Sequence, residues 1–80
     1  MTGVRVGVLG AGSWGTAIAA LLAGNGHDVV LWSFEEDVAR TIREGGRNEK
    51  YLKGVDLPPG LGATDRIAEA VAGANVVVSV

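Results

Sequence analysis

The sequence predicts an α/β fold built on a parallel β-sheet, and three observations lead to that prediction. Short valine-rich runs alternate along the chain with segments whose apolar residues follow a helical period. The last of these runs is almost entirely valine, as is typical of parallel strands that are covered on both faces. The 80 residues include 13 glycines, about twice the number that an average usage of roughly 7% would give, and many stand where a run or segment ends.

The first strand is predicted over Val4–Leu9, an apolar run that stops at Gly10. A helix follows, because apolar residues recur at positions i, i+3, i+4, i+7 and i+8 and form one stripe. The predicted inward stripe consists of Trp14, Ala17, Ile18, Leu21 and Leu22. The run Gly24-Asn25-Gly26 then ends the helix.

A second strand and helix follow with the same arrangement. The strand is predicted over Val29–Trp32 and the helix over Glu35–Glu44. Acidic residues occupy the first turn of this helix, and Arg40 and Arg43 occupy the last. This order of charges complements the helix dipole, and Gly45-Gly46 supplies the end.

The segment 47–60 shows no clear period and contains Pro58-Pro59, so it is predicted to be a loop, with one helical turn around Lys50 as an alternative. A short third strand is predicted over Leu61–Thr64. Thr64 or Asp65 then caps a third helix that extends to about residue 72. Ile67 and Val71, four residues apart, are expected to face inward on that helix.

A fourth strand is predicted over Asn75–Val80, buried on both faces. Alternating strands and helices imply parallel pairing with right-handed crossovers. In the common doubly wound order, the fourth strand lies beside the first, on the side away from the second. We therefore expect residues 1–80 to form the N-terminal part of a Rossmann-type doubly wound sheet, its first four strands only. The rest of that domain and a substrate domain are expected to lie outside this sequence.

Composition excludes several classes of function. A net charge of −2 and a pI of about 5.2 give no basic surface for nucleic acid. The longest stretch without charged residues, Val6–Gly26, is interrupted by glycines and polar residues, so no membrane insertion is expected. The chain has no cysteine, hence no disulfide or thiolate ligand, and no cluster of other ligands predicts a metal site. A cytoplasmic location is compatible with this composition.

The run Gly10-Ala11-Gly12-Ser13-Trp14-Gly15 is a GxGxxG motif between a predicted strand and a predicted helix. Gly10 permits a tight turn, Gly12 has no side chain to block a pyrophosphate, and Gly15 allows close packing of the helix on the strand. Backbone N–H groups at the helix start, including those of Ser13 and Trp14, are expected to face the phosphates. The alternative is that the three glycines serve packing alone.

An acidic residue at the end of the second strand is the other half of a dinucleotide fingerprint, because it can hold the ribose hydroxyls. Glu35 lies 20 residues after Gly15 and is the candidate; the alternative is that it only favours the helix N-terminus. Phe34 could lie against an adenine or could be core beneath the second helix. We find no nucleophile–base pair and name no catalytic residue.

These motifs resemble the N-terminal domain of NAD(P)-dependent glycerol-3-phosphate dehydrogenases over nearly all 80 residues. The similarity rests on the glycine motif, the turn Asn25-Gly26-His27, the segment Asn48-Glu49-Lys50-Tyr51-Leu52 and the run Leu57-Pro58-Pro59. The resemblance implies an enzyme that interconverts dihydroxyacetone phosphate and sn-glycerol 3-phosphate, a step that supplies phospholipid backbones. It also implies that Ser13, Trp14, Phe34 and Tyr51 line the dinucleotide and that the full-length protein is a homodimer.

Two departures from this family bear on the cofactor. Bacterial members often carry a basic pair where this chain has Phe34-Glu35, and the arginine of that pair can receive the 2′-phosphate of NADP. Here three consecutive acids would repel such a phosphate, so we expect NAD, with NADP less favoured. The other departure is Lys53, which stands where the family usually has proline after Tyr-Leu.

The family's lysines for proton transfer and for binding the substrate phosphate come later in the chain, so residues 1–80 alone are expected to be inactive. Two other functions remain open at this stage. Ketopantoate reductase and related β-hydroxyacid dehydrogenases share the glycine-rich start with a different substrate. A non-catalytic nucleotide-sensing domain would also fit, because one fold can serve several functions.

Overall fold

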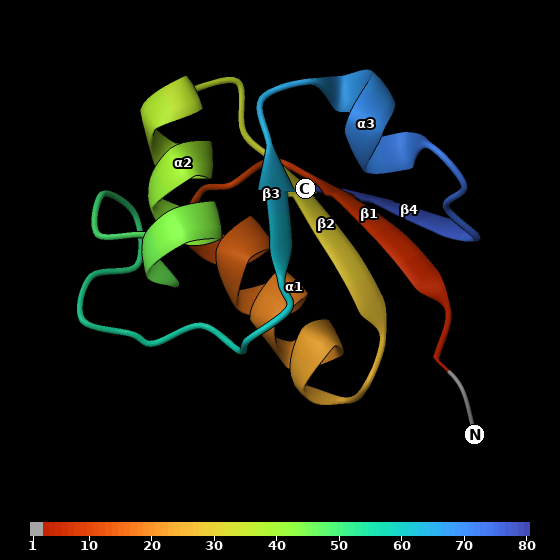
Figure 1. The fold of residues 1–80 in the computed structure, drawn as a ribbon, viewed down its shortest axis with the longest axis horizontal. Coiled ribbons are helices and arrows are strands. Elements are labelled where there is room, and N and C mark those ends of the chain that lie inside the picture. Colours follow the sequence, from red (N-terminus) through yellow and green to blue (C-terminus); the bar gives the residue numbers. More distant parts are fainter. Residues whose placement is uncertain (1–2) are drawn as a thin grey trace.

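A computed structural model describes residues 3–80, and it contains the seven alternating elements that the sequence predicts (Figure 1). Residues 1 and 2, which belong to the predicted segment 1–80, lie outside the residues that the structure describes. The strands are β1 (Arg5–Leu9), β2 (Asp28–Trp32), β3 (Gly62–Thr64) and β4 (Val76–Ser79). The helices are α1 (Ser13–Gly24), α2 (Glu36–Gly45) and α3 (Ile67–Val71).

The four strands form one parallel sheet in the order β3-β2-β1-β4, which confirms the predicted topology. Leu9, the last residue of β1, pairs with Trp32 of β2 and with Ser79 of β4. The carboxyl ends of these three strands therefore lie side by side. The loops that follow β1 and β2 leave the sheet at the same edge, where open α/β sheets bind their ligands.

The sheet is covered on both faces, with α1 and α2 on one side and α3 on the other (Figure 1). Alternate residues of the central strands face α1 and α2, because side chains along a strand alternate between the faces. Their fully or nearly fully buried members are Val6, Val8, Val29 and Leu31. Val38, Ala39 and Ile42 of α2 complete this core, together with Leu57 and Leu61 from the loop before β3.

The predicted inward stripe of α1 is wrong in detail. Trp14 and Leu21 are 75% and 66% exposed, whereas the buried residues of the helix are Gly15, Thr16 and Ala19. A Cβ atom on Gly15 would overlap the carbonyl oxygen of Gly10, so the helix lies too close to the end of β1 to admit a large side chain. The fully buried residues of the helix are therefore small, whereas Ile18 is half-buried and Leu22 packs against the edge of the core.

The expected burial of α3 and β4 also needs correction. Ile67 and Val71 are exposed, and Ala70 is the buried residue of α3. The reason is again close packing, because the backbone of Ala70 lies directly over Gly7 of β1. Val76 and Val77 of β4 are nearly half exposed, so in the described residues this strand forms an open edge of the sheet rather than a strand covered on both faces.

The start of α3 differs slightly from expectation, whereas the long loop contains the turn that the sequence offers as an alternative. The backbone cap of α3 is Arg66, although the Thr64 hydroxyl accepts a hydrogen bond from the Arg66 N–H group at 3.0 Å and donates one to Glu69 at 2.9 Å. The loop between α2 and β3 contains a single turn around Lys50, because the Leu52 N–H group donates to the Asn48 carbonyl oxygen at 2.8 Å, four residues back. The same two residues form an isolated antiparallel bridge. Across residues 3–80, no helix has both the length and the apolar character that crossing a membrane requires.

We expect Gly7→Ala to reduce the free energy of unfolding by about 1–3 kcal/mol, because the added methyl group meets the Ala70 carbonyl group and the backbone must shift. Gly24→Ala in α1 is the control, since nothing lies within 4 Å of a Cβ atom there. The control should be neutral or stabilising by up to about 1 kcal/mol. Chemical denaturation measures both; equal effects of the two variants would contradict close packing at Gly7.

Candidate functional site

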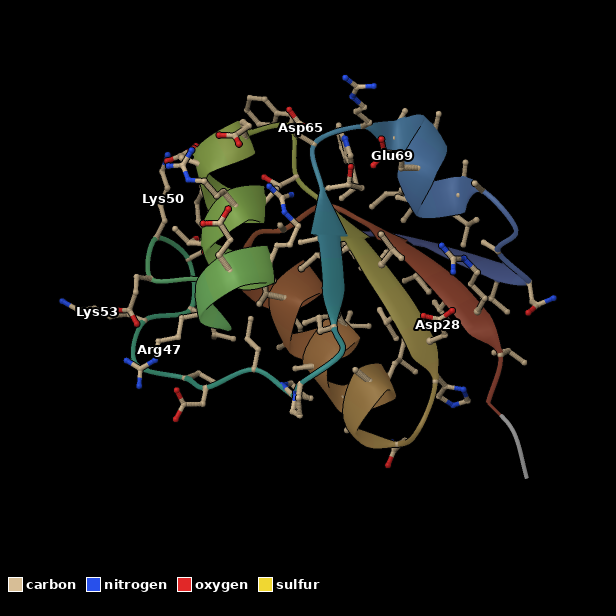
Figure 2. All side chains as sticks on the ribbon, in the orientation of Figure 1. Asp28, Arg47, Lys50, Lys53, Asp65 and Glu69 are labelled. Carbon is tan, nitrogen blue, oxygen red and sulfur yellow. The ribbon has the colours of Figure 1, made fainter. Side chains whose placement is uncertain are left out.

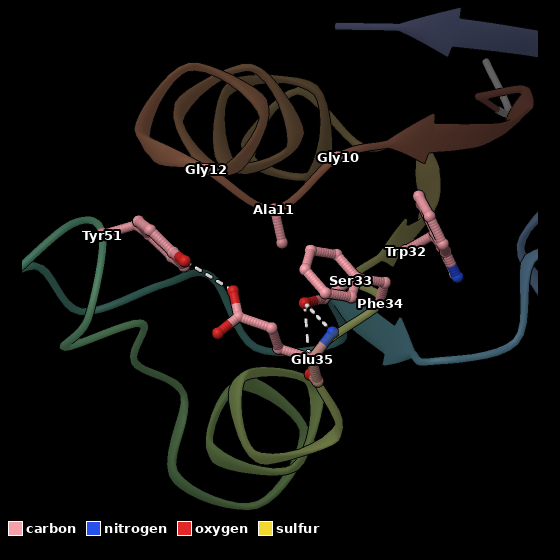
Figure 3. Close-up of a pocket in the computed structure, with 8 residues that line it drawn as sticks. All are labelled: Gly10, Ala11, Gly12, Trp32, Ser33, Phe34, Glu35 and Tyr51. Atoms are coloured by element: carbon pink, nitrogen blue, oxygen red, sulfur yellow. Dashed lines mark hydrogen bonds between the residues drawn. The ribbon is translucent and has the colours of Figure 1, made fainter.

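A pocket of about 260 Å³ opens at the carboxyl ends of β1 and β2 (Figure 3). Three segments that are distant in sequence line it: the turn after β1, the turn after β2, and the loop between α2 and β3. The lining residues are Gly10, Ala11, Gly12, Trp32, Ser33, Phe34, Glu35 and Tyr51. Six of these eight were predicted as site residues from the sequence; Trp32 and Ser33 were not.

Each motif glycine has a distinct place in the turn after β1. Gly10 has a φ of 123°, a conformation that residues with a side chain rarely adopt, and its N–H group donates to the Trp32 carbonyl oxygen at 3.0 Å. Gly15 lies against Gly10, as the close packing of α1 requires. No atom lies within 4 Å of the position that a Cβ atom on Gly12 would occupy. The fold therefore leaves open the space in front of Gly12, and packing does not explain the glycine there.

The N-terminal end of α1 faces this open space without a side-chain cap. Gly12 is the capping residue, its carbonyl oxygen accepts the first helical hydrogen bond from Thr16 at 3.0 Å, and no acidic residue stands in the first turn. The first N–H groups of a helix have no partner within the helix and carry partial positive charge. The N–H groups of Ser13, Trp14 and Gly15 are thus placed to receive an anion. These three residues, which the sequence predicts as site residues, are not among those that line the pocket.

A buried asparagine joins the long loop to the glycine turn. Asn48 has no exposed surface, and its Nδ2 group donates to the Ala11 carbonyl oxygen and to the Thr16 hydroxyl, both at 2.9 Å. Its Oδ1 atom accepts the Tyr51 N–H group at 3.2 Å. One amide therefore fixes the positions of the turn, the first helix and the loop that carries Tyr51. Sequence periodicity gives no signal for a polar residue buried inside a loop.

Glu35 directs its side chain into the pocket and meets two residues of that loop. The Tyr51 hydroxyl donates to Glu35 Oε1 at 2.5 Å, as Figure 3 shows, and Lys50 Nζ forms an ion pair with Oε2. The hydrogen bonds from Lys50 and then Tyr51 lower the pKa of the Glu35 carboxyl group below its usual range. The hydrogen bond to Glu35 raises the pKa of both Lys50 and Tyr51. The three residues thus form a charge-neutral cluster at the edge of the pocket.

The two candidate residues after β2, Phe34 and Glu35, both line the pocket. Phe34 is 78% exposed and lines the pocket, so it is not core beneath α2. Glu35 is the backbone cap of α2, but its side chain makes no capping hydrogen bond. The Ser33 hydroxyl holds this turn, accepting from the Glu35 N–H group and donating to the Glu35 carbonyl oxygen, both at 3.1 Å. Ser33 positions Glu35, and nothing in its spacing from the motif predicts that role.

Residues 3–80 contain no group of three or more histidine, aspartate or glutamate side chains arranged to hold a metal ion. His27 lies in the turn before β2, and its Nδ1 atom accepts the Val4 N–H group at 3.1 Å. At the pocket, the structure brings together a helix start without a side-chain cap, a carboxylate and an exposed aromatic ring.

We expect Asn48→Ala to lower the free energy of unfolding by about 1–3 kcal/mol, because it leaves the buried Ala11 carbonyl and Thr16 hydroxyl groups without this partner. Asn25→Ala, at an exposed turn, is the control and should change stability by less than about 0.5 kcal/mol. Thermal or chemical unfolding measures both. A loss no larger than that of the control would show that the amide does not hold the loop.

Tyr51 should titrate at higher pH than an ordinary tyrosine, since its phenol donates to an ionised carboxylate. The Tyr51–Glu35 hydrogen bond stabilises the fold at every pH below the ordinary pKa of tyrosine. This stabilisation is lost as the pH rises through the raised pKa of Tyr51. At the acid end, the lowered pKa of Glu35 keeps the contact until pH falls through that value. Tyr51 is the only tyrosine in the chain, so phenolate absorbance reports it directly.

Two matched variants test this contact, Glu35→Gln and Glu36→Gln. Glu35→Gln should lower the pH midpoint of the Tyr51 titration toward the ordinary value for tyrosine. Glu36 pairs with Arg40 at 2.7 Å on the exposed side of α2, and its removal should leave the midpoint unchanged. If Glu35→Gln and wild type share one midpoint, the Tyr51–Glu35 hydrogen bond does not persist in solution.

Comparisons with known proteins agree with this geometry. Residues 5–80 match the family described as NAD-dependent glycerol-3-phosphate dehydrogenase N-terminus. The chain is 46% identical over 77 residues to a glycerol-3-phosphate dehydrogenase [NAD(P)+] of Trichlorobacter lovleyi, covering 96% of this chain and 23% of that protein. It is 51% identical over 75 residues to the enzyme of the same name from Anaeromyxobacter sp., covering 94% of this chain and 23% of that protein.

Solved structures give the same result. The crystal structure of glycerol-3-phosphate dehydrogenase from Coxiella burnetii superposes with a TM-score of 0.87 at 35% identity, over 96% of this chain and 24% of the other. The enzyme from Saccharomyces cerevisiae also superposes with a TM-score of 0.87, at 29% identity, over all of this chain and 26% of the other. The chain thus spans about a quarter of the length of these relatives. It belongs to the NAD-dependent glycerol-3-phosphate dehydrogenase family and corresponds to the N-terminal, Rossmann-type part of it.

Proposed function

We propose that this chain is the cofactor-binding segment of an oxidoreductase that interconverts dihydroxyacetone phosphate and sn-glycerol 3-phosphate, with NAD(H) preferred over NADP(H). One observation carries the proposal. A single pocket combines the uncapped N-terminus of α1, the open space in front of Gly12 and the carboxylate of Glu35. These are the groups that a dinucleotide needs for its pyrophosphate and its ribose.

The phosphates would lie in front of Gly12, where a side chain would fill the space that the fold leaves empty. The N–H groups of Ser13, Trp14 and Gly15 would donate to the phosphate oxygens, and the partial positive charge of the helix end would add to their attraction. Gly10 and Ala11 would form the wall of the turn. This part of the site uses backbone groups only, so its geometry depends on the close packing of α1.

The adenosine end would lie toward the turn after β2. The Glu35 carboxylate would accept hydrogen bonds from the ribose hydroxyls, and the exposed ring of Phe34 offers an apolar face to the adenine. Tyr51 closes this side of the pocket through its hydrogen bond to Glu35. When bound, the cofactor supplies the hydride chemistry, and these residues bind and orient it.

The preference for NAD(H) rests on Glu35. A carboxylate that accepts from a ribose 2′-hydroxyl stands where a 2′-phosphate would place two further negative charges, and like charges at contact distance disfavour binding. Of the three consecutive acids, Glu36 is paired with Arg40 and points along α2, so it contributes little to this discrimination. Glu35 is the acid that lines the pocket.

The activity belongs to the full-length protein. The family resemblance suggests that the residues for proton transfer and for the substrate phosphate lie beyond residue 80, so we propose that residues 1–80 alone are inactive. We further propose that the full-length enzyme is a cytoplasmic homodimer whose partners are small phosphate esters, with neither nucleic acid nor membrane insertion involved. The net charge of −2 supports the exclusion of nucleic acid.

The test measures NADH and NADPH oxidation by the full-length protein with dihydroxyacetone phosphate, alongside dinucleotide binding. We expect turnover with a higher kcat/KM for NADH. Gly12→Val should weaken dinucleotide binding by about 100-fold, since hydrogen bonds to a charged group are each worth about 1.5–3 kcal/mol. Helix content should change little, because the space at Gly12 is open.

The control is Gly24→Ala at the other end of α1, which should keep full affinity. Comparable kcat/KM for the two cofactors would refute the preference. Dinucleotide binding without turnover would indicate a sensing domain, and full affinity in Gly12→Val would mean that the motif glycines serve packing alone.

A further inference from the structure

The carboxylate at the ribose end of the pocket already has a cationic partner from this chain. Lys50 Nζ contacts Glu35 Oε2, and the Tyr51 hydroxyl holds Oε1 at 2.5 Å. The Glu35 side chain is 18% exposed and that of Lys50 is 51% exposed. The ammonium group therefore contacts a carboxylate that lines the pocket and is itself half exposed, so water and a ligand can both reach it.

This ion pair changes the charge that an approaching nucleotide meets. The sequence places three acids in a row at positions 35–37. In the structure the first is paired with Lys50 and the second with Arg40 at 2.7 Å. The remaining charged group that bears on Lys50 is Asp37, in the first turn of α2. Cations from this chain thus compensate two of the three acidic charges, and the negative charge of Asp37 remains.

The backbone of Lys50 is fixed while its charge can move. Asn48 and the Asn48–Leu52 bridge hold the loop on both sides of residue 50. The lysine side chain is a flexible four-carbon stem that ends in a point charge. A ribose hydroxyl that binds Glu35 leaves Lys50 paired with the other carboxylate oxygen or with solvent. A 2′-phosphate at the same position would instead have the Lys50 ammonium group as its nearest cation.

We propose that Lys50 is a specificity-determining residue of the cofactor site, which weakens the discrimination that Glu35 exerts against a ribose 2′-phosphate. The proposal rests on the proposed function, because it requires a dinucleotide in this pocket. Glu35 favours the 2′-hydroxyl, and Lys50 offsets part of that effect by neutralising the carboxylate and by offering a cation to the phosphate. The chain would accept NADP(H) as a second cofactor more readily than its acidic run suggests.

Lys53 provides a matched control for a test of this assignment. It is the other lysine of the same loop, and Figure 2 shows it pointing outward, whereas Lys50 lies beside the start of α2. Lys53 takes part in no ion pair found among residues 3–80, whereas Lys50 pairs with Glu35, which lines the pocket. Removing either charge changes the net charge of the protein equally, so a difference between the two variants reflects position.

The experiment measures dissociation constants for NADH and NADPH on the full-length protein with wild type, Lys50→Met, Lys53→Met, Glu35→Gln and the Glu35→Gln/Lys50→Met double variant. We expect Lys50→Met to raise the ratio of the NADPH to the NADH constant by about tenfold, the order expected for one partly exposed charge at contact distance. Lys53→Met should change the ratio by less than about twofold, since exposed charges farther away are screened.

Glu35→Gln should lower the ratio, and the double variant should return it toward the wild-type value because both opposing charges are gone. Raising the salt concentration should shrink the effect of Lys50→Met. A purely structural role would shift both constants equally, and that result, or a lower ratio in Lys50→Met, would overturn the proposal. Absence of binding of either nucleotide to the wild-type protein would instead refute the proposed function itself.

Discussion

The contact between the start of α1 and the end of β1 is the constraint from which the rest of the site follows. Gly15 lies so close to the Gly10 carbonyl group that no side chain fits between them. This distance determines which residues face the sheet at the start of α1, where Gly15 and Thr16 are buried. Trp14 is consequently turned toward solvent, and the first turn of the helix has no side-chain cap.

Polar residues then adapt the rest of the pocket to that helix end. Thr16, next to Gly15, is buried and needs a hydrogen-bond partner, which the amide of Asn48 provides. The same amide brings the loop between α2 and β3 against the glycine turn, and with it Lys50 and Tyr51. The turn after β1 and the turn after β2 are therefore connected through this loop, by Asn48 to Ala11 and by Tyr51 to Glu35.

The sequence predicts the architecture well because the signals for it are local. Valine-rich runs, helical periods and terminating glycines place all seven elements, and the handedness of crossovers gives the strand order. Burial is predicted less well. An apolar stripe indicates which residues favour burial, but only small residues fit where a helix packs closely on a strand. Gly15 and Ala70 are therefore buried, whereas Trp14 and Ile67 are exposed.

The glycine turn, Phe34, Glu35 and Tyr51 are likewise accessible to sequence reasoning, through a motif and a resemblance. The roles of Ser33, Asn48 and Lys50 are not, because each depends on a side chain meeting a partner from another segment. Lys50 shows the limit most clearly. The three acids at positions 35–37 alone predict a site that repels a phosphate. In the folded chain, Lys50 supplies a compensating cation to Glu35 from 15 residues farther along the sequence.

The central position of β1 also has a consequence for the order in which the chain assembles. Its partner on one side, β2, follows after a single helix, whereas β4 on the other side joins it through contacts such as Arg5 with Asn75, separated by 70 residues. Closing a loop of that length carries a larger entropy cost than closing the β1–α1–β2 unit. The glycine turn and its helix can therefore form early, while the second edge of β1 waits for the last strand. During synthesis, the proposed nucleotide pocket, whose lining residues end at Tyr51, would form before β4 joins the sheet.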